Sequence, residues 1–275
     1  MVRWGGRNGS VETGIDVLEE ENFARLAVLK QKHGGKLRMG VLTSQTGVDS
    51  HSRRTIDILY KDAAAKVPGL TLTTIFSTEH GIQGELDTIN IPDNTDSATE
   101  LPIVSLYGAT DAKRHPSPEQ MQKLDAVVID LQDAGVRNYT REIAMAYFLQ
   151  AAAHSGTDIV VLDRPDPLTG SFVQGPVSDA AHSSCTSFMP FPARHGMTMG
   201  ELARYFNREG HIGASLTVVP VKGCQRGDWY DSTSLLWINP SPNLRNMDEE
   251  TLYPGIGMIE TSNISAGRGT DTPLQ

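Results

Sequence analysis

Five apolar runs of this chain each lead directly into a cluster of polar and ionisable residues. With their polar ends, the runs span residues 39–47, 72–81, 126–137, 159–167 and 191–196. Runs dense in Val, Ile and Leu are typical of buried strands, so the polar clusters fall where strands would end. Ligands of open parallel α/β sheets bind in the crevice beyond the carboxyl ends of the strands. We therefore expect the five junctions to form the walls of one site.

Strand-like runs alternate with helical patterns along most of the chain. Strands are expected at 37–44, 70–77, 103–107, 125–131, 158–163 and 216–221, and helices at 15–30, 55–66, 117–124, 140–154 and 198–209. The strand runs are too uniformly apolar to have one solvated face. They predict an α/β protein with a mostly parallel sheet and helices on both faces. The long segments 81–101 and 164–197 are expected to contribute to the site.

Two of the expected helices begin with capping signals. Ser117 is a suitable N-cap, and Pro118 suits the first helical position that follows it. Thr198 and Glu201 have the T-x-x-E spacing of a capping box. Both signals stand where the alternation requires a helix to begin.

Composition and motifs exclude several classes of protein. With 24 basic and 33 acidic residues and a net charge of −9, the chain lacks the charge of a nucleic-acid binder. No apolar run approaches the roughly 20 residues of a membrane-spanning helix. Cys185 and Cys224 lack CxxC or Cys/His ligand spacing, so neither a disulfide framework nor a structural zinc site is expected. No glycine-rich phosphate-binding motif follows the first strand, which argues against a nucleotide-binding protein.

The two ends of the chain lead to two further expectations. Residues 1–14 lack the charged, apolar and small-residue plan of a signal peptide. We therefore expect either a cytoplasmic protein or an export segment outside this chain. The segment 267–275 reads as the middle of a loop, which predicts a further C-terminal part.

Eight motifs in order resemble the NamZ-type exo-β-N-acetylmuramidase family. They are STEHGIQGE (77–85), LPIVSLYG (101–108), DLQDAGVRNYT (130–140), VLDRPDPLTG (161–170), QGPV (174–177), PARHGMTMGELARYFNRE (192–209), NPSPNL (239–244) and YPGIGMIETSNISAGRGT (253–270). The resemblance runs from about Gly14 to the last residue.

This resemblance implies a Rossmann-like catalytic domain over 14–223 and the beginning of a smaller C-terminal domain over 224–275. It implies the release of N-acetylmuramic acid from the non-reducing end of peptidoglycan fragments, without a metal or organic cofactor. By the same resemblance, muramyl saccharides are the expected partners, and the periplasm or the cell exterior is the expected location. The alternative is a non-catalytic domain that binds or senses peptidoglycan fragments through the same residues.

Glu79 is the expected catalytic acid. Glycoside hydrolysis usually needs one carboxylic acid to protonate the departing oxygen and a second group to meet the oxocarbenium-like centre. Glu79 follows an apolar strand and precedes Gly81, whose backbone can approach a ligand closely. His80 is expected to assist, either through hydrogen bonds or by controlling the ionisation of Glu79. The alternative is that Glu79 only caps the following turn.

The second catalytic group stays open at this level. Asp130, Asp133 and Asp163 are expected to bind substrate, and with Glu260 they are candidates for that group. Ion pairing with a nearby arginine is the alternative for each, and the 2-acetamido group of the substrate is another candidate. The family pattern has glutamate where this chain has Gln174. An amide can neither donate a proton as an acid nor act as a nucleophile, so the expected activity depends on whether that glutamate is needed.

N-Acetylmuramic acid carries a lactyl carboxylate, so a selective site needs a cation. Arginine suits this role because its planar fork binds carboxylates through two hydrogen bonds. Arg137 and Arg194 are the first candidates and Arg268 the next, with surface ion pairing as the alternative. Further expected substrate contacts are Tyr139, His195, Asn243 and Asn263.

Overall fold

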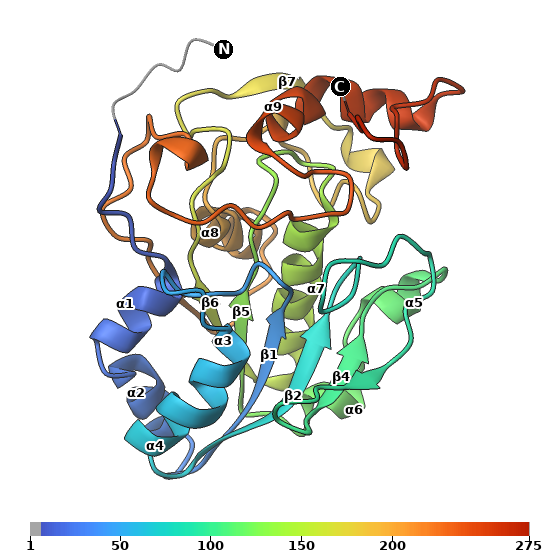
Figure 1. The fold of residues 1–275 in the computed structure, drawn as a ribbon. Coiled ribbons are helices and arrows are strands. Elements are labelled where there is room, and N and C mark those ends of the chain that lie inside the picture. The colour runs from blue at the N-terminus through green and yellow to red at the C-terminus, as the bar shows by residue number, and fades with distance from the viewer. Residues whose placement is uncertain (1–6, 275) are drawn as a thin grey trace.

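The structure, a computed structural model, describes residues 7–274 and contains a seven-stranded sheet (Figure 1). The strand order is β3-β4-β2-β1-β5-β6-β9. The strands are β1 (Leu37–Thr43), β2 (Leu70–Ser77), β3 (Asn94–Thr95), β4 (Pro102–Ser105), β5 (Ala126–Asp130), β6 (Asp158–Leu162) and β9 (Leu216–Val219). Every pairing is parallel except that of β3 with β4. The prediction of a mostly parallel α/β sheet is confirmed.

Helices cover both faces of this sheet. One face carries α1 (Gly14–Glu20), α2 (Ala24–Lys32) and the helical segment α3 (Thr55–Asp57), η1 (Ile58–Ala63) and α4 (Ala64–Lys66). The other carries α6 (Pro118–Met121), α7 (Thr140–Ser155) and α8 (Met199–Glu209). Successive side chains of a strand point to opposite faces. Val41 of β1 accordingly lies in the first hydrophobic core and Leu42 in the second.

The capping signals act as expected. The Ser117 side chain accepts a hydrogen bond from the Gln120 amide at the start of α6, and Thr198 accepts one from the Glu201 amide at the start of α8. Each cap satisfies an amide that has no partner within its helix. These two helix starts are therefore set by local sequence.

Two expected helices differ from the prediction. The helix expected at 15–30 is interrupted, because Asn22 and Phe23 adopt the left-handed conformation and turn the chain between α1 and α2. This turn buries Phe23 in the core. The helix expected at 55–66 is continuous, but its middle, η1, is a π-helix. The extra residue per turn in such a segment changes which side chains face the core.

The strand order places a crevice at the carboxyl ends of β1 and β5. From β1 the chain proceeds through β2 to β4 in one direction, and then through β5 and β6 to β9 in the other. At such a reversal the loops that follow β1 and β5 run in opposite directions and leave space between them. Ligands of doubly wound folds bind between these two loops. The polar segments after β1, β2 and β5 all reach this end of the sheet.

The segment from residue 224 onward packs over the same end, where its orange and red ribbon lies above the strand arrowheads in Figure 1. Leu244, Tyr253 and Leu274 pack with Val136 and Tyr139 in a third hydrophobic cluster. The remaining elements are α5 (Asp111–Arg114), β7 (Gln174–Val177), η2 (Ala180–His182), β8 (Pro192–Arg194), η3 (Tyr230–Ser232), α9 (Met247–Ile256) and η4 (Gly257–Thr261). The division into domains at residue 224 stays a prediction.

No helix within residues 7–274 is both long and apolar enough to cross a membrane. The segment 1–14, which bears on a signal peptide, lies partly outside the described residues.

Candidate active site

Glu79 lies directly beyond β2, and two hydroxyl groups hold its carboxylate. Tyr107, in the loop after β4, donates to Oε1 at 2.7 Å, and Thr140, the first residue of α7, donates to Oε2 at 2.7 Å. A hydroxyl can rotate to donate to a carboxylate or to accept from a carboxylic acid. Two separate elements, the loop after β4 and the start of α7, thus fix Glu79 in an orientation that suits either protonation state.

His80 is held in a defined tautomer beside Glu79. Its backbone is left-handed at φ 68°, and the following Gly81 has φ 71°, so the chain turns sharply here. The ring Nδ1 donates to the Leu86 carbonyl at 2.8 Å, which leaves Nε2 as an acceptor. Burial lowers the pKa of His80, although the Glu79 charge opposes this. A neutral imidazole is therefore presented to the cleft at neutral pH.

A cleft of about 380 Å³ opens at this point, with surrounding solvent included in that volume. It is lined by Glu79, His80, Tyr139, Asn243, Glu260 and Arg268, together with smaller contributions from neighbouring residues. Five of these six are expected site residues, and the sixth, Glu260, is a candidate for the second catalytic group. The cleft is formed between the loop after β2, the start of α7 and the segment 241–274.

Glu260 is the second carboxylate of the cleft. Burial raises the pKa of Glu260, and the Arg268 guanidinium, 3.3 Å from Oε1, opposes that rise. The negative charge of Glu79 acts in the same direction as burial. Arg268 also pairs with Asp87 at 3.0 Å, so its charge is shared between two carboxylates.

Tyr139 and Asn243 lie in the cleft but already have partners. The buried Tyr139 hydroxyl donates to the Pro240 carbonyl at 2.8 Å. Asn243 donates to Asp87 at 3.3 Å and accepts from the Gly269 amide at 3.3 Å. Both side chains shape the wall of the cleft. The expected contact Asn263 is exposed and lies outside the lining.

Asp130 and Asp163 serve the fold instead. Asp130 forms a buried ion pair with Arg164 and accepts a hydrogen bond from Thr55. Asp163 accepts from the Gly200 amide at 2.6 Å and from Thr198 at 3.1 Å, so it stabilises the start of α8. Neither carboxylate lines the cleft at Glu79. The expected convergence of all junctions on one site is therefore only partial.

Asp133 and His195 belong to a buried cluster beneath the site. His195 Nε2 lies 3.1 Å from Asp133 and 3.5 Å from Glu142, and Nδ1 lies 3.6 Å from Asp166. Burial raises the pKa of Asp166 to about 6, with His195 opposing, and burial raises the pKa of Glu142 well above its ordinary value. Asp166 and Glu142 therefore keep their protons to a higher pH than exposed carboxyl groups do.

Asp133, Glu142 and His195 also have the spacing of a metal site, because their ligand atoms lie within 4.8 Å of one another. The hydrogen bonds argue against that use. The Met197 amide donates to His195 Nδ1 at 3.1 Å, so Nε2 carries the ring proton and donates it to Asp133. A protonated Nε2 has no lone pair to offer a metal. While this hydrogen bond is in place, His195 Nε2 is not available as a ligand.

The two arginines expected to hold the lactyl carboxylate point elsewhere. Arg137 donates to the Pro176 carbonyl at 2.8 Å, and also to the Phe191 carbonyl. Arg194 donates to Gln174 at 2.9 Å and lies over the rings of Phe172 and Trp229. Both arginines brace the segment that contains β7 and β8, and neither lines the cleft.

Comparison with known proteins identifies the family. The model of the N-terminal part of the exo-β-N-acetylmuramidase NamZ matches residues 39–248. The chain belongs to this family. The peptidoglycan β-N-acetylmuramidase NamZ of Bacillus subtilis (strain 168) is 39% identical over 266 residues, which make up 96% of this chain and 60% of that protein.

Solved structures agree with the NamZ assignment. One crystal structure of a DUF1343 family protein from Bacteroides fragilis NCTC 9343 has a TM-score of 0.83 at 35% identity and covers 96% of this chain. A second one from that organism has a TM-score of 0.78 at 34% identity and covers 97%. The chain spans 64% and 66% of their respective lengths.

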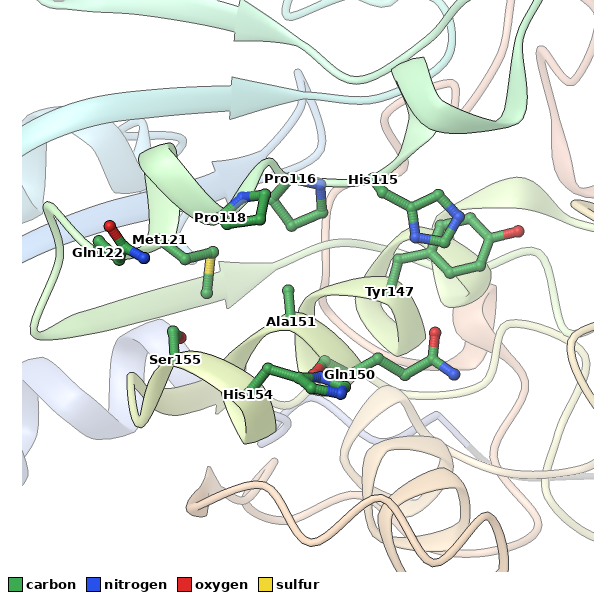
Figure 2. A pocket seen from close by; sticks show the side chains of 10 residues that line it. All are labelled: His115, Pro116, Pro118, Met121, Gln122, Tyr147, Gln150, Ala151, His154 and Ser155. Carbon is green, nitrogen blue, oxygen red and sulfur yellow. The ribbon is translucent and has the colours of Figure 1, made fainter.

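A second pocket, of about 810 Å³ with surrounding solvent included, lies away from the NamZ candidate site, between the segment 115–122 and α7 (Figure 2). Its lining includes Pro116, Pro118, Met121 and the rings of Tyr147 and His154. It contains no carboxylate, and glycoside hydrolysis usually depends on a pair of them. Its lining therefore lacks the groups on which glycoside hydrolysis usually depends.

Sequence reasoning missed Tyr107 and Thr140, the two residues that hold Glu79. Both lie in motifs on which the family resemblance rests, Tyr107 in LPIVSLYG and Thr140 in DLQDAGVRNYT. Their positions could have indicated this role, because Tyr107 follows the end of β4 and Thr140 begins α7, both at the edge of the sheet where Glu79 lies. A hydroxyl there is within reach of a neighbouring strand-end carboxylate.

Proposed function

We propose that this chain carries the catalytic site of an exo-β-N-acetylmuramidase. The reaction is hydrolysis of the glycosidic bond that joins N-acetylmuramic acid to the non-reducing end of a peptidoglycan fragment. The observation that carries the proposal is Glu79, held by two hydroxyls in a cleft that also contains Glu260. Membership of the NamZ family and the name of the Bacillus subtilis relative support the same substrate.

In this proposal Glu79 protonates the leaving oxygen. As the glycosidic bond breaks, the proton passes from the Glu79 carboxyl to that oxygen, and the carboxylate that remains can later accept a proton from water. Tyr107 and Thr140 hold both oxygens throughout, because their hydroxyls can rotate to match the change. The side chain therefore needs little reorganisation during the step.

Glu260 is the proposed second group. Its carboxylate lies in the same cleft and pairs with Arg268, whose positive charge opposes the rise that burial causes in the pKa of Glu260. The ionised form is the one that must face an oxocarbenium-like centre. Gln174, which stands at a glutamate position of the family pattern, lies on β7 and accepts from Arg194 outside this cleft. Its amide therefore removes no carboxylate from the pair Glu79 and Glu260.

The test is hydrolysis of a chromogenic β-N-acetylmuramide and of a disaccharide with N-acetylmuramic acid at its non-reducing end. The parent chain, Glu79→Gln and Glu85→Gln are compared, since Glu85 is exposed and outside the cleft. We expect hydrolysis by the parent and Glu85→Gln and almost none by Glu79→Gln. A parent chain that binds the sugar without cleaving it would favour a binding or sensing domain.

We further infer that the protein acts in the periplasm or outside the cell.

A further inference from the structure

Glu79 borders two hollows. One is the cleft described above. The other, of about 290 Å³ with surrounding solvent included, is also lined by Glu79, and its lining further includes Tyr107, Arg114, Tyr147 and Cys185. Tyr147 also borders the larger pocket, where His115 stacks on it with ring centroids 3.7 Å apart (Figure 2). Tyr147 and His115 thus form the wall between this hollow and the larger pocket.

Arg114 is the cation of this hollow, and it has no carboxylate partner within residues 7–274. Its guanidinium lies over the Tyr107 ring, 5.9 Å from the centroid. Its Nε is buried and has no hydrogen-bond partner among the described residues. The neighbouring Lys113 pairs with Asp93, and His115 Nε2 lies 3.3 Å from Asp111. A partly buried guanidinium that lacks a counter-ion is suited to bind an anion.

One tyrosine links this cation to the proposed acid. The Tyr107 ring packs against the Arg114 guanidinium, and the Tyr107 hydroxyl donates to Glu79 Oε1 at 2.7 Å. A sugar whose glycosidic oxygen approaches Glu79 can therefore place an anionic substituent against Arg114. The other arginines considered for this role lack the freedom to do so. Arg137 and Arg194 bind main-chain carbonyls, and Arg268 is shared by two carboxylates.

We propose that Arg114 binds the lactyl carboxylate of N-acetylmuramic acid and selects this sugar over N-acetylglucosamine. The proposal rests on the proposed function, because it places the muramyl ring at Glu79. The guanidinium would meet the carboxylate through two parallel hydrogen bonds, which use its fork geometry as well as its charge. N-Acetylglucosamine lacks the carboxylate and leaves Arg114 without a partner.

The test measures dissociation constants by calorimetry for N-acetylmuramic acid, its lactyl amide and N-acetylglucosamine. Arg114→Ala should weaken binding of N-acetylmuramic acid by roughly 10- to 100-fold and leave the other two ligands unchanged. Arg114→Lys should recover only part of the loss, since it keeps the charge without the fork. Lys113→Ala is the matched control, because Lys113 pairs with Asp93 at the surface.

The rate at which Cys185 is alkylated gives an independent measurement of where the sugar binds. In a Cys224→Ser background Cys185 is the one remaining cysteine, and it lines the hollow. N-Acetylmuramic acid should slow the alkylation of Cys185 by iodoacetamide in the parent chain. The same sugar should slow this reaction much less in Arg114→Ala. Thermal unfolding of Arg114→Ala and Lys113→Ala checks that both variants fold.

Three results would overturn the inference. Equal losses for the acid, its amide and N-acetylglucosamine would make Arg114 a structural residue. A muramyl dipeptide carries an amide in place of the lactyl carboxylate. If Arg114→Ala weakens binding of this dipeptide as much as binding of the free acid, Arg114 would bind a peptide carboxylate instead. A parent chain that binds none of these sugars would remove the proposed function itself, and the Arg114 proposal with it.

Discussion

Tyr107 and Glu79 are joined by a hydrogen bond of 2.7 Å between the loop after β4 and the loop after β2. The two strands are neighbours in the sheet, so their carboxyl ends bring these loops together. The bond orients the proposed acid from one side, and Thr140 orients it from the other. It also connects Glu79 to Arg114 through a single aromatic ring.

Removal of the Tyr107 hydroxyl should lower turnover without weakening sugar binding. Tyr107→Phe keeps the ring beneath Arg114 and deletes only the donor to Glu79. We expect kcat to fall roughly 3- to 10-fold, the equivalent of one modest hydrogen bond. Tyr60→Phe, on η1 far along the chain, should have no effect. A loss of affinity for N-acetylmuramic acid with unchanged kcat would show that the hydroxyl serves binding and not Glu79.

The leaving-group dependence should separate the roles of Glu79 and Glu260. Glu79→Gln should lower the rate on a natural disaccharide by roughly 10²- to 10⁴-fold, and by much less on a substrate whose leaving group needs no proton. Glu260→Gln should slow both substrates alike, because the second group acts on the sugar ring. The reverse pattern would exchange the two assignments. Full activity of Glu260→Gln would leave the acetamido group of the substrate as the second group.

The sheet could be predicted from the sequence because its strands are buried on both faces. The expected strand at 70–77 agrees with β2 at both ends, and the strand at 37–44 agrees with β1 to within one residue. A doubly buried strand needs an unbroken apolar run, which is a local signal. The break at Phe23 left no such signal, because an aromatic residue rarely adopts the left-handed conformation.

The candidate site could be predicted only in part. The position of Glu79 after an apolar strand was sufficient to place it at the edge of the sheet. An ion pair with an arginine was the alternative for Asp130, and the structure forms it with Arg164, 34 residues away. The sequence did not decide between that pair and a substrate contact, because only the fold brings the two residues together. Arg114 stands among other charged residues in the segment 111–115, and its lack of a partner becomes evident only in three dimensions.

Loss of one partner of the buried pair Asp130 and Arg164 should destabilise the protein strongly. Arg164→Ala leaves the Asp130 charge buried with only Thr55 beside it, which should lower the free energy of unfolding by about 3–5 kcal/mol. The double change Arg164→Met with Asp130→Leu should cost less than the single one, since no charge is then left alone. Urea unfolding measures both. Arg38→Ala, which breaks an exposed pair with Asp125, should have little effect.

The buried acids predict that stability falls as the pH rises through weakly acidic values. Burial raises the pKa of Asp166 from 3.8 to about 6, so the folded state holds a proton that the unfolded state has released. A group whose folded pKa is raised contributes its full stability below the unfolded pKa and loses it as pH rises through the folded pKa. For Asp166 this window is pH 3.8 to about 6, and the loss amounts to roughly 3 kcal/mol. Glu142 extends the same trend to higher pH, because burial raises its pKa well above the ordinary value.

Asp166→Asn should therefore flatten this pH dependence. The amide keeps the shape of the side chain and can still accept from the Leu168 amide, but it carries no charge to bury. We expect the free energy of unfolding of the variant to exceed that of the parent above pH 6 and to approach it near pH 4. Urea unfolding at half-unit steps between pH 4 and pH 8 measures the difference, with the exposed Asp271→Asn as the control. Parallel curves for parent and variant would show that Asp166 keeps its charge in the folded protein, and that His195 stabilises the charge there.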